Sequence, residues 1–244
     1  HLGIMYEWGR GVSQDNVKAV EWIRKSAEQG NTKAVEWYRK SAEQGNVIAQ
    51  CQLGTMYEKG RGVSRDFAKA VEWYRKSAEQ GNADAQCNLG FMYRNGLGVS
   101  LDYAKAVEWY RKSVEQGNVT AQNNLGYMYE QGLGDSQDYA KAMDMYVLDK
   151  GVIENYAKAA KLYRKSAEQG YAEAQYNLGR MFENGRGVSK DYAKAVEWYR
   201  KSAEQGEVRS QCKLGYMYHN GIGVSKDYAK AAEWYRKAAM GGNM

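Results

Sequence analysis

Residues 82–117 read NADAQCNLGFMYRNGLGVSLDYAKAVEWYRKSVEQG, and this stretch contains two successive helical patterns. In the first pattern apolar residues recur at i, i+4, i+7 and i+8, which is the spacing of one face of a helix: Ala85, Leu89, Met92 and Tyr93. Asn82 can cap the start of this helix, and Gly96 can end it in a left-handed conformation. We refer to this segment as helix A of the unit.

The second pattern opens at Asp102, a good N-cap in front of an apolar-periodic run, and stops at Gly117. Its stripe consists of four residues flanked by Trp109: Tyr103, Ala106, Val107 and Tyr110. We refer to it as helix B. A single pair of such helices cannot bury both of its apolar faces, so successive pairs must stack on one another. The unit therefore predicts an all-α solenoid of antiparallel helix pairs.

The Leu-Gly pair of helix A recurs along the chain, and three of its spacings are 36 residues. The copies are Leu2-Gly3, Leu53-Gly54, Leu89-Gly90, Leu125-Gly126, Leu178-Gly179 and Leu214-Gly215. We expect one solenoid domain over residues 1–244 with about 14 helices. Its repeats are 1–30 (truncated), 31–45 (a half repeat), 46–81, 82–117, 118–170 (with about 17 extra residues), 171–206 and 207–242.

The period breaks at two joints. Residues 31–45 read as a helix B with no helix A before it. Residues 138–151, DYAKAMDMYVLDKG, begin like a helix B and finish like a helix A. Each joint adds one helix that breaks the alternation of helices A and B. A local kink or a repacked pair is therefore expected there. The alternative is that one of these segments is only partly helical.

Composition narrows the function classes. The formal net charge of +6 is modest for 244 residues, and the basic side chains of helix B alternate with Glu at i, i+4, as in Glu72 and Lys76. Nucleic-acid binding is therefore not expected. No run of 18 apolar residues is present, so no membrane span is expected. Three unpaired cysteines slightly favour the cytoplasm, but the compartment stays open, with the bacterial periplasm and secretion included.

The cysteines and the aromatic pairs are both interpreted as packing residues. Cys51, Cys87 and Cys212 occupy one position of helix A and are expected to be small buried residues. The Trp-Tyr pairs of helix B are expected in the core and between repeats, where truncating one Trp should cost about 3–5 kcal/mol. These pairs are Trp73-Tyr74, Trp109-Tyr110, Trp198-Tyr199 and Trp234-Tyr235.

No catalytic, cofactor-binding or metal-binding residue is predicted, and the chain is not expected to be an enzyme. His occurs twice, and no His/Cys/Asp cluster has metal-ligand spacing. Ser210 and Lys213 form one Ser-x-x-Lys match, as in β-lactam-recognising enzymes, but other copies carry Ala at the Ser position. The Asp residues that precede helix B are interpreted as caps: Asp15, Asp66, Asp102, Asp138, Asp191 and Asp227.

Three positions of helix A vary between copies, at i, i+3 and i+7, whereas core positions hardly change. Asn and Gln can hydrogen-bond a peptide backbone, and aromatic side chains supply rigid contact area. We predict that this variable stripe contacts a partner; the alternative is an unconstrained face that drifts. Its members are Gln52, Thr55, Lys59; Asn88, Phe91, Asn95; Asn124, Tyr127, Gln131; Asn177, Arg180, Asn184; Lys213, Tyr216, Asn220; and, in the truncated copy, Ile4 and Trp8.

The pattern LG-x-MY-x-x-G-x-GV followed by D-Y-x-KA-x-x-WYRK-x-AEQG resembles the Sel-one-like repeat (SLR) family, a relative of the tetratricopeptide repeat. The resemblance implies a right-handed superhelix, a concave groove lined by helices A, and an adaptor role in protein complexes. One branch of the family staples each repeat with a Cys pair. Here Ala78 and Val114 stand at the partner end in helix B, which disfavours that branch.

The expected function is a non-catalytic scaffold that binds a partner protein or an extended peptide. One alternative is a bacterial immunity or virulence adaptor that blocks its partner. Two others are a purely structural spacer and a hydrolase or β-lactam-binding protein. End-to-end self-association through exposed apolar ends is also expected to be possible.

Overall fold

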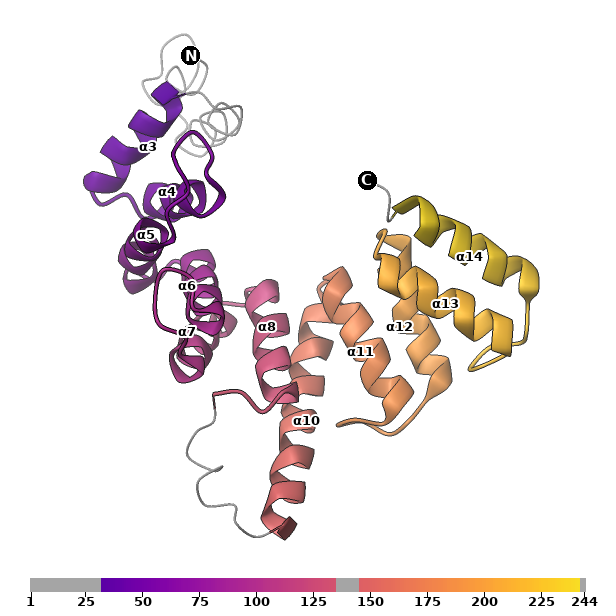
Figure 1. Cartoon of the computed structure of the whole chain (residues 1–244). Helices are drawn as coiled ribbons and strands as arrows, with labels where there is room; N and C mark the ends of the chain where they lie inside the picture. The colour runs from indigo at the N-terminus through magenta and orange to yellow at the C-terminus, as the bar shows by residue number, and fades with distance from the viewer. Residues whose placement is uncertain (1–31, 135–144, 242–244) are drawn as a thin grey trace. The chain divides into compact units, whose positions relative to one another are not determined.

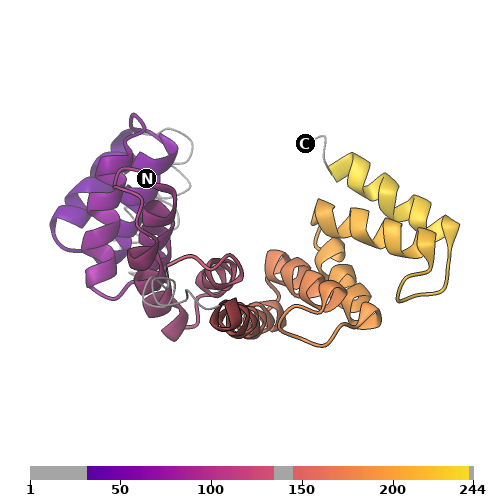
Figure 2. The same cartoon turned by 60° about the horizontal axis from the view of Figure 1, so that its bottom comes forward.

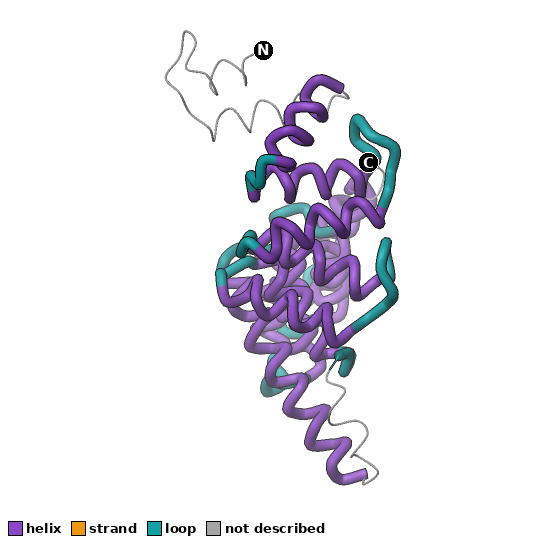
Figure 3. Tube along the Cα trace, turned by 90° about the vertical axis from the view of Figure 1, so that its left-hand side faces the viewer, coloured by secondary structure: helices purple, strands orange, loops and turns teal. Residues whose placement is uncertain are grey.

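The computed structural model describes residues 32–134 and 145–241, and within them it consists of helices without a strand (Figures 1 and 3). This confirms the all-α solenoid class. The chain divides into two compact units, residues 1–116 and 117–244, which are described separately. Unit 1 holds α3 (Thr32–Glu43), α4 (Val47–Lys59), α5 (Phe67–Glu79), α6 (Ala83–Asn95) and α7 (Tyr103–Glu115). Unit 2 holds α8 (Val119–Glu130), α10 (Met145–Glu168), α11 (Ala172–Asn184), α12 (Tyr192–Glu204), α13 (Val208–Asn220) and α14 (Tyr228–Gly241).

The described residues contain 11 helices, fewer than the predicted count of about 14. The truncated first repeat and residues 135–144 lie outside the described residues. Helices A and B of each repeat pack as a pair, and each helix B packs against the next helix A of its unit; the pairs α11/α12 and α13/α14 can be followed in Figure 2. One solenoid domain over the whole chain, and its repeat boundaries, stay predictions.

Side-chain caps fix where the helices start, as the sequence predicts. Asn82 accepts a hydrogen bond from the backbone N–H of Ala85 at 2.8 Å at the start of α6. Asp102 accepts one from the N–H of Lys105 at 2.9 Å at the start of α7. This N–H holds the pKa of the Asp102 carboxyl below its usual value. The polar residue in front of each of these apolar stripes thus accepts a hydrogen bond from a backbone N–H group that has no partner within the helix.

The invariant glycine of helix A lets helix B approach closely. A Cβ atom added to Gly90 would lie 2.8 Å from the Tyr110 ring, and one added to Gly179 would lie 2.8 Å from the Tyr199 ring. Both tyrosine side chains are fully buried. The ring therefore packs flat on the backbone of its partner helix, and this contact forms the centre of each repeat.

The tryptophans next to these tyrosines are not in the core, which corrects the sequence-based expectation. Trp73, Trp109, Trp198 and Trp234 are half-buried, and a Lys three residues later lies 4.2–4.4 Å from each ring centre. Consecutive positions on a helix point about 100° apart. Tyr therefore faces helix A, whereas Trp lies at the edge of the solvated face.

Short polar side chains tie neighbouring elements together. The Ser113 hydroxyl donates to the carbonyl of Ala83 at 2.7 Å, and the Gln86 side chain donates to the carbonyl of Ala78 at 3.1 Å. The loop after α6 lies against the start of α5, so closely that a Cβ added to Gly98 would lie 2.3 Å from the Phe67 carbonyl oxygen. The recurring Ser, Gln and G-x-G residues are therefore structural.

The two joints behave differently. Residues 31–45 contain α3, as predicted for a helix B, with Val35, Tyr38 and Ala42 buried. At the second joint the prediction that residues 138–151 finish as a helix A of their own is wrong, because α10 is one helix of 24 residues that continues through Gly151. In the other repeats helix A ends at a left-handed glycine such as Gly60 (φ 67°), whereas Asp149 stands at the equivalent position here. Without that glycine the helix continues.

Candidate partner-binding surface

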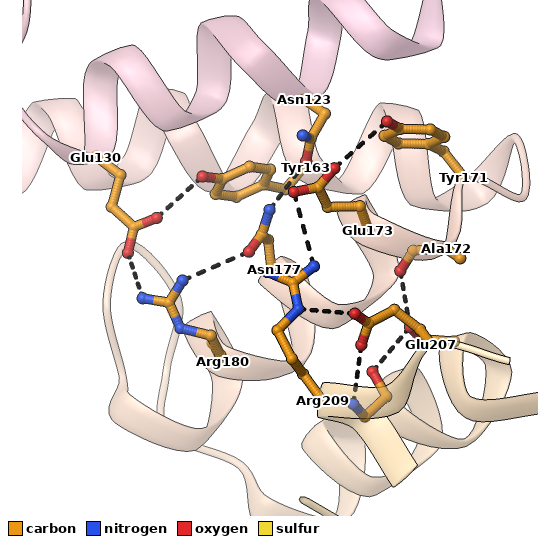
Figure 4. Close-up of polar contacts among 12 residues, drawn as sticks. Asn123, Glu130, Tyr163, Tyr171, Ala172, Glu173, Asn177, Arg180, Glu207 and Arg209 are labelled. Atoms are coloured by element: carbon orange, nitrogen blue, oxygen red, sulfur yellow. Dashed lines mark hydrogen bonds and ion pairs between the residues drawn. The ribbon is translucent and has the colours of Figure 1, made fainter. Parts of the chain in front are cut away.

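In unit 2 the helices A of three repeats lie side by side. Hydrogen bonds and ion pairs connect α8 to α11 and α11 to α13, as Figure 4 shows for several of them. Asn177 donates to the Asn123 side-chain oxygen at 2.9 Å, between α11 and α8. Lys213 donates to a Glu183 carboxylate oxygen at 2.9 Å, between α13 and α11. We call the exposed side of α8, α11 and α13 the A surface of unit 2.

A buried carboxylate organises the contact between α8 and α11. The Glu130 side chain is 2% exposed, accepts a hydrogen bond from the Tyr163 hydroxyl at 2.9 Å and pairs with Arg180 at 2.9 Å (Figure 4). Arg186 lies 3.9 Å away. Burial, and then the charge of Glu130, raise the pKa of Tyr163, so this hydroxyl stays a donor. The arrangement satisfies a charge that would be costly to bury alone.

Part of the variable stripe is therefore used inside the protein. Asn177 is buried, and Arg180 and Lys213 pair with glutamates of the preceding helix A. The sequence assigned all three to partner contacts. Variation between copies did not separate them from the exposed positions, because their neighbours belong to the preceding helix A, 30 to 54 residues away in sequence.

The middle position of the stripe exposes an aromatic side chain in three repeats. Phe91, Tyr127 and Tyr216 occupy this position in three repeats and are 37%, 36% and 49% exposed. Asn95, Asn184 and Asn220 are exposed and donate to the carbonyl four residues earlier. Of the remaining members, Lys59 and Gln131 are exposed, whereas Gln52, Thr55, Asn88 and Asn124 are half-buried. Ile4 and Trp8 lie outside the described residues.

An open groove of about 440 Å³ runs between α11 and α13 on the A surface. It is lined by Tyr176, Val208, Arg209, Cys212, Lys213 and Tyr216. The Arg209 guanidinium lies 4.5 Å from the centre of the Tyr176 ring and pairs with Glu207 at 2.7 Å. The lining thus combines two tyrosines with two basic side chains, which suits a peptide side chain with an apolar body.

The cysteine prediction holds for two positions and is wrong for the third. Cys51 and Cys87 are buried, and burial raises the pKa of the Cys51 thiol to about 12. Cys212 is exposed in the groove. The same position in α11, Tyr176, is covered by Arg209 of the next helix A, whereas no helix A follows α13 within the described residues.

The Ser-x-x-Lys match does not form a catalytic pair. The Ser210 hydroxyl is buried and donates to the Ser202 hydroxyl at 2.8 Å, whereas the Lys213 ammonium lies on Glu183. Among the residues in the two described ranges, no group of three His, Cys, Asp or Glu side chains could hold a metal ion. None of the helices described is both long and apolar enough to cross a membrane.

The variant Arg180→Ala is expected to lower the free energy of unfolding by about 1–3 kcal/mol, because the buried Glu130 carboxylate loses its nearer cation. Urea denaturation followed by circular dichroism measures the change. The matched control is Lys112→Ala, which removes an exposed pair with Glu108 and should cost at most about 0.5 kcal/mol. Equal losses in the two variants would show that the Glu130 pair is not part of the folded interior.

Comparison with known proteins gives two concordant results. A family model described as Sel1 repeat matches residues 1–31, 32–46, 47–82, 83–118, 119–148, 144–171, 172–207 and 208–243. The chain is similar to a solved Sel1 repeat protein from Oxalobacter formigenes, with 33% identity and a TM-score of 0.76, over 92% of this chain and 83% of the other. A search of curated protein sequences gave no match.

Two further solved structures share the fold alone. The immunity protein Pa5087 from Pseudomonas aeruginosa is 21% identical with a TM-score of 0.57, over 91% of this chain and 81% of its own. The immunity protein PA5088 from the same organism is 21% identical with a TM-score of 0.55, over 86% of this chain and 75% of its own.

Proposed function

The chain belongs to the Sel1 repeat family, and from this premise we propose that it is a non-catalytic scaffold that binds a partner protein or an extended peptide on its helices A. Sel1 repeat proteins are in general scaffolds for protein interactions. The site proposed here is the exposed part of the variable stripe, centred on Phe91 in unit 1 and on Tyr127 and Tyr216 in unit 2.

The observation that carries the proposal is the exposure of an aromatic side chain at one repeat position. At the positions that flank it along helix A, Gly90 and Met92, Gly126 and Met128, and Gly215 and Met217, every residue is buried. Phe and Tyr bury large areas on binding and lose little conformational entropy. The groove beside Tyr216 adds a place for a side chain of the partner.

The triple variant Phe91→Ala, Tyr127→Ala, Tyr216→Ala is expected to weaken partner binding at least about tenfold, because aromatic anchors carry most of the energy of an interface. The partner is first captured from an extract with the wild-type chain and identified by mass spectrometry. Its affinity for each variant is then measured by calorimetry, and circular dichroism verifies the fold.

The matched control removes exposed aromatic side chains from helices B, at Tyr192 and Tyr228. Affinity should be unchanged in this control. A triple variant that folds and binds as tightly as the wild type would reject the proposed surface. If the captured partner is a toxin whose activity the chain suppresses, the scaffold acts as an immunity protein.

End-to-end association stays a separate prediction. Tyr235 on α14 is 41% exposed, whereas its counterpart Tyr199 is covered by α13 and fully buried. Within the described residues no helix A packs on this face of α14, and we expect a helix A of a second copy to bind there as α13 packs on α12.

A further inference from the structure

One carboxylate recurs in helix A with the same hydrogen-bond donor from helix B. In three repeats a Glu lies three residues after the middle stripe position and accepts a hydrogen bond from the hydroxyl of the buried tyrosine. The pairs are Tyr74 and Glu58 at 2.5 Å, Tyr163 and Glu130 at 2.9 Å, and Tyr199 and Glu183 at 2.5 Å. The same donor therefore orients the carboxylate in all three repeats.

In unit 2 each of these carboxylates binds a cation from the next helix A. Arg180 lies 2.9 Å from Glu130, and Lys213 lies 2.9 Å from Glu183 (Figure 4 shows the first pair). Arg180 occupies the middle stripe position of its repeat, and Lys213 occupies the first. A Glu at this position can thus pair with either a guanidinium or an ammonium group from the next helix A.

Unit 1 has the carboxylate without the cation. The stripe positions that supply the cation in unit 2 are occupied in α6 by Asn88 and Phe91, which are neutral. Within the described part of the chain no ion pair to Glu58 forms, and its side chain is half-buried. The Tyr74 hydroxyl donates to Oε2 of Glu58, which leaves the Oε1 oxygen for another donor.

We propose that Glu58 binds a Lys or Arg side chain of the partner, in the place that Arg180 and Lys213 take in unit 2. The exposed Phe91 ring lies at the stripe position of Arg180 and offers an aromatic face to the stem or guanidinium of that side chain. A charge-assisted hydrogen bond at a half-buried carboxylate is stronger than one between neutral groups. This inference rests on the proposed function and adds the charge of the partner residue that contacts unit 1.

The test uses a phage-displayed library of random peptides selected on the full chain. Peptides whose binding requires Phe91, Tyr127 and Tyr216 are expected to share a Lys or Arg. Their dissociation constants should rise at least about tenfold for Glu58→Gln. The matched control, Glu72→Gln, removes an exposed carboxylate of α5 that pairs with Lys76, and should leave binding unchanged.

A second variant supplies the cation for Glu58 from the chain itself. Asn88→Lys places an ammonium group at the position of Lys213, so it should pair with Glu58 and weaken the same peptides. Added to Glu58→Gln, it should have no further effect. Selected peptides that require the three aromatics, lack a shared basic residue and bind Glu58→Gln normally would overturn this inference and leave the proposed function standing. If no peptide requires the aromatics, the proposed function falls and this inference falls with it.

Discussion

The variant Gly98→Ala is expected to lower the free energy of unfolding by roughly 2–5 kcal/mol, as measured by urea denaturation. Two causes add up. Gly98 has φ 68°, a left-handed conformation that costs a residue with a side chain about 1–2 kcal/mol. In addition, the new Cβ would lie 2.3 Å from the carbonyl carbon and oxygen of Phe67 and 2.7 Å from the Ala68 nitrogen. Backbone atoms at the start of a helix cannot move aside cheaply, so the loop must detach from α5.

The control for this variant is Gly81→Ala. Gly81 has φ 92°, but an added Cβ would meet no atom within 4 Å. It therefore isolates the conformational cost, about 1–2 kcal/mol, from the clash. Equal losses at the two glycines would show that the loop after α6 does not lie on α5, and the stacking described for unit 1 would be wrong.

The variant Tyr199→Ala is expected to cost about 3–5 kcal/mol, which is typical of truncating a large buried aromatic side chain. Tyr199 is fully buried, packs on Gly179 and donates to Glu183. Its neighbour Trp198 is larger but half-buried, so Trp198→Ala should cost about half as much, since the cost scales with the area removed from water. Circular dichroism during urea denaturation follows both variants.

This pair of variants tests whether Trp or Tyr is the core residue of helix B. The sequence-based prediction gave the large cost to Trp, whereas the structure gives it to Tyr. A larger loss for Trp198→Ala than for Tyr199→Ala would contradict the packing of helix B on helix A. Tyr199→Phe separates the ring from its hydroxyl, because it retains the contact with Gly179 and removes only the hydrogen bond to Glu183.

The sequence was sufficient for the helix pairs because the signals for them are local. The stripe of α6, its Asn82 cap and its terminal Gly96 lie within one helix length, and each acts through neighbouring backbone. The Trp-Tyr pair was ambiguous, since both residues are aromatic and adjacent, and only the direction of each side chain separates them.

The features that escaped prediction depend on contacts between repeats. No sequence pattern singled out Glu130, which is buried because Tyr163 and Arg180 converge on it from α10 and α11. The sequence did indicate the long α10, since Asp149 replaces the glycine that ends helix A elsewhere. The sequence-based prediction instead followed the likeness of residues 138–151 to the end of a helix A.

The most direct test of the account uses the exposed thiol in the groove of the A surface. Cys51 and Cys87 are buried, so N-ethylmaleimide should alkylate Cys212 first. With the captured partner bound at saturating concentration, the alkylation rate of Cys212 should fall at least about tenfold, because the partner covers Tyr216 and the groove. An unchanged rate in the saturated complex would contradict the claim that the helices A of unit 2 form the binding surface.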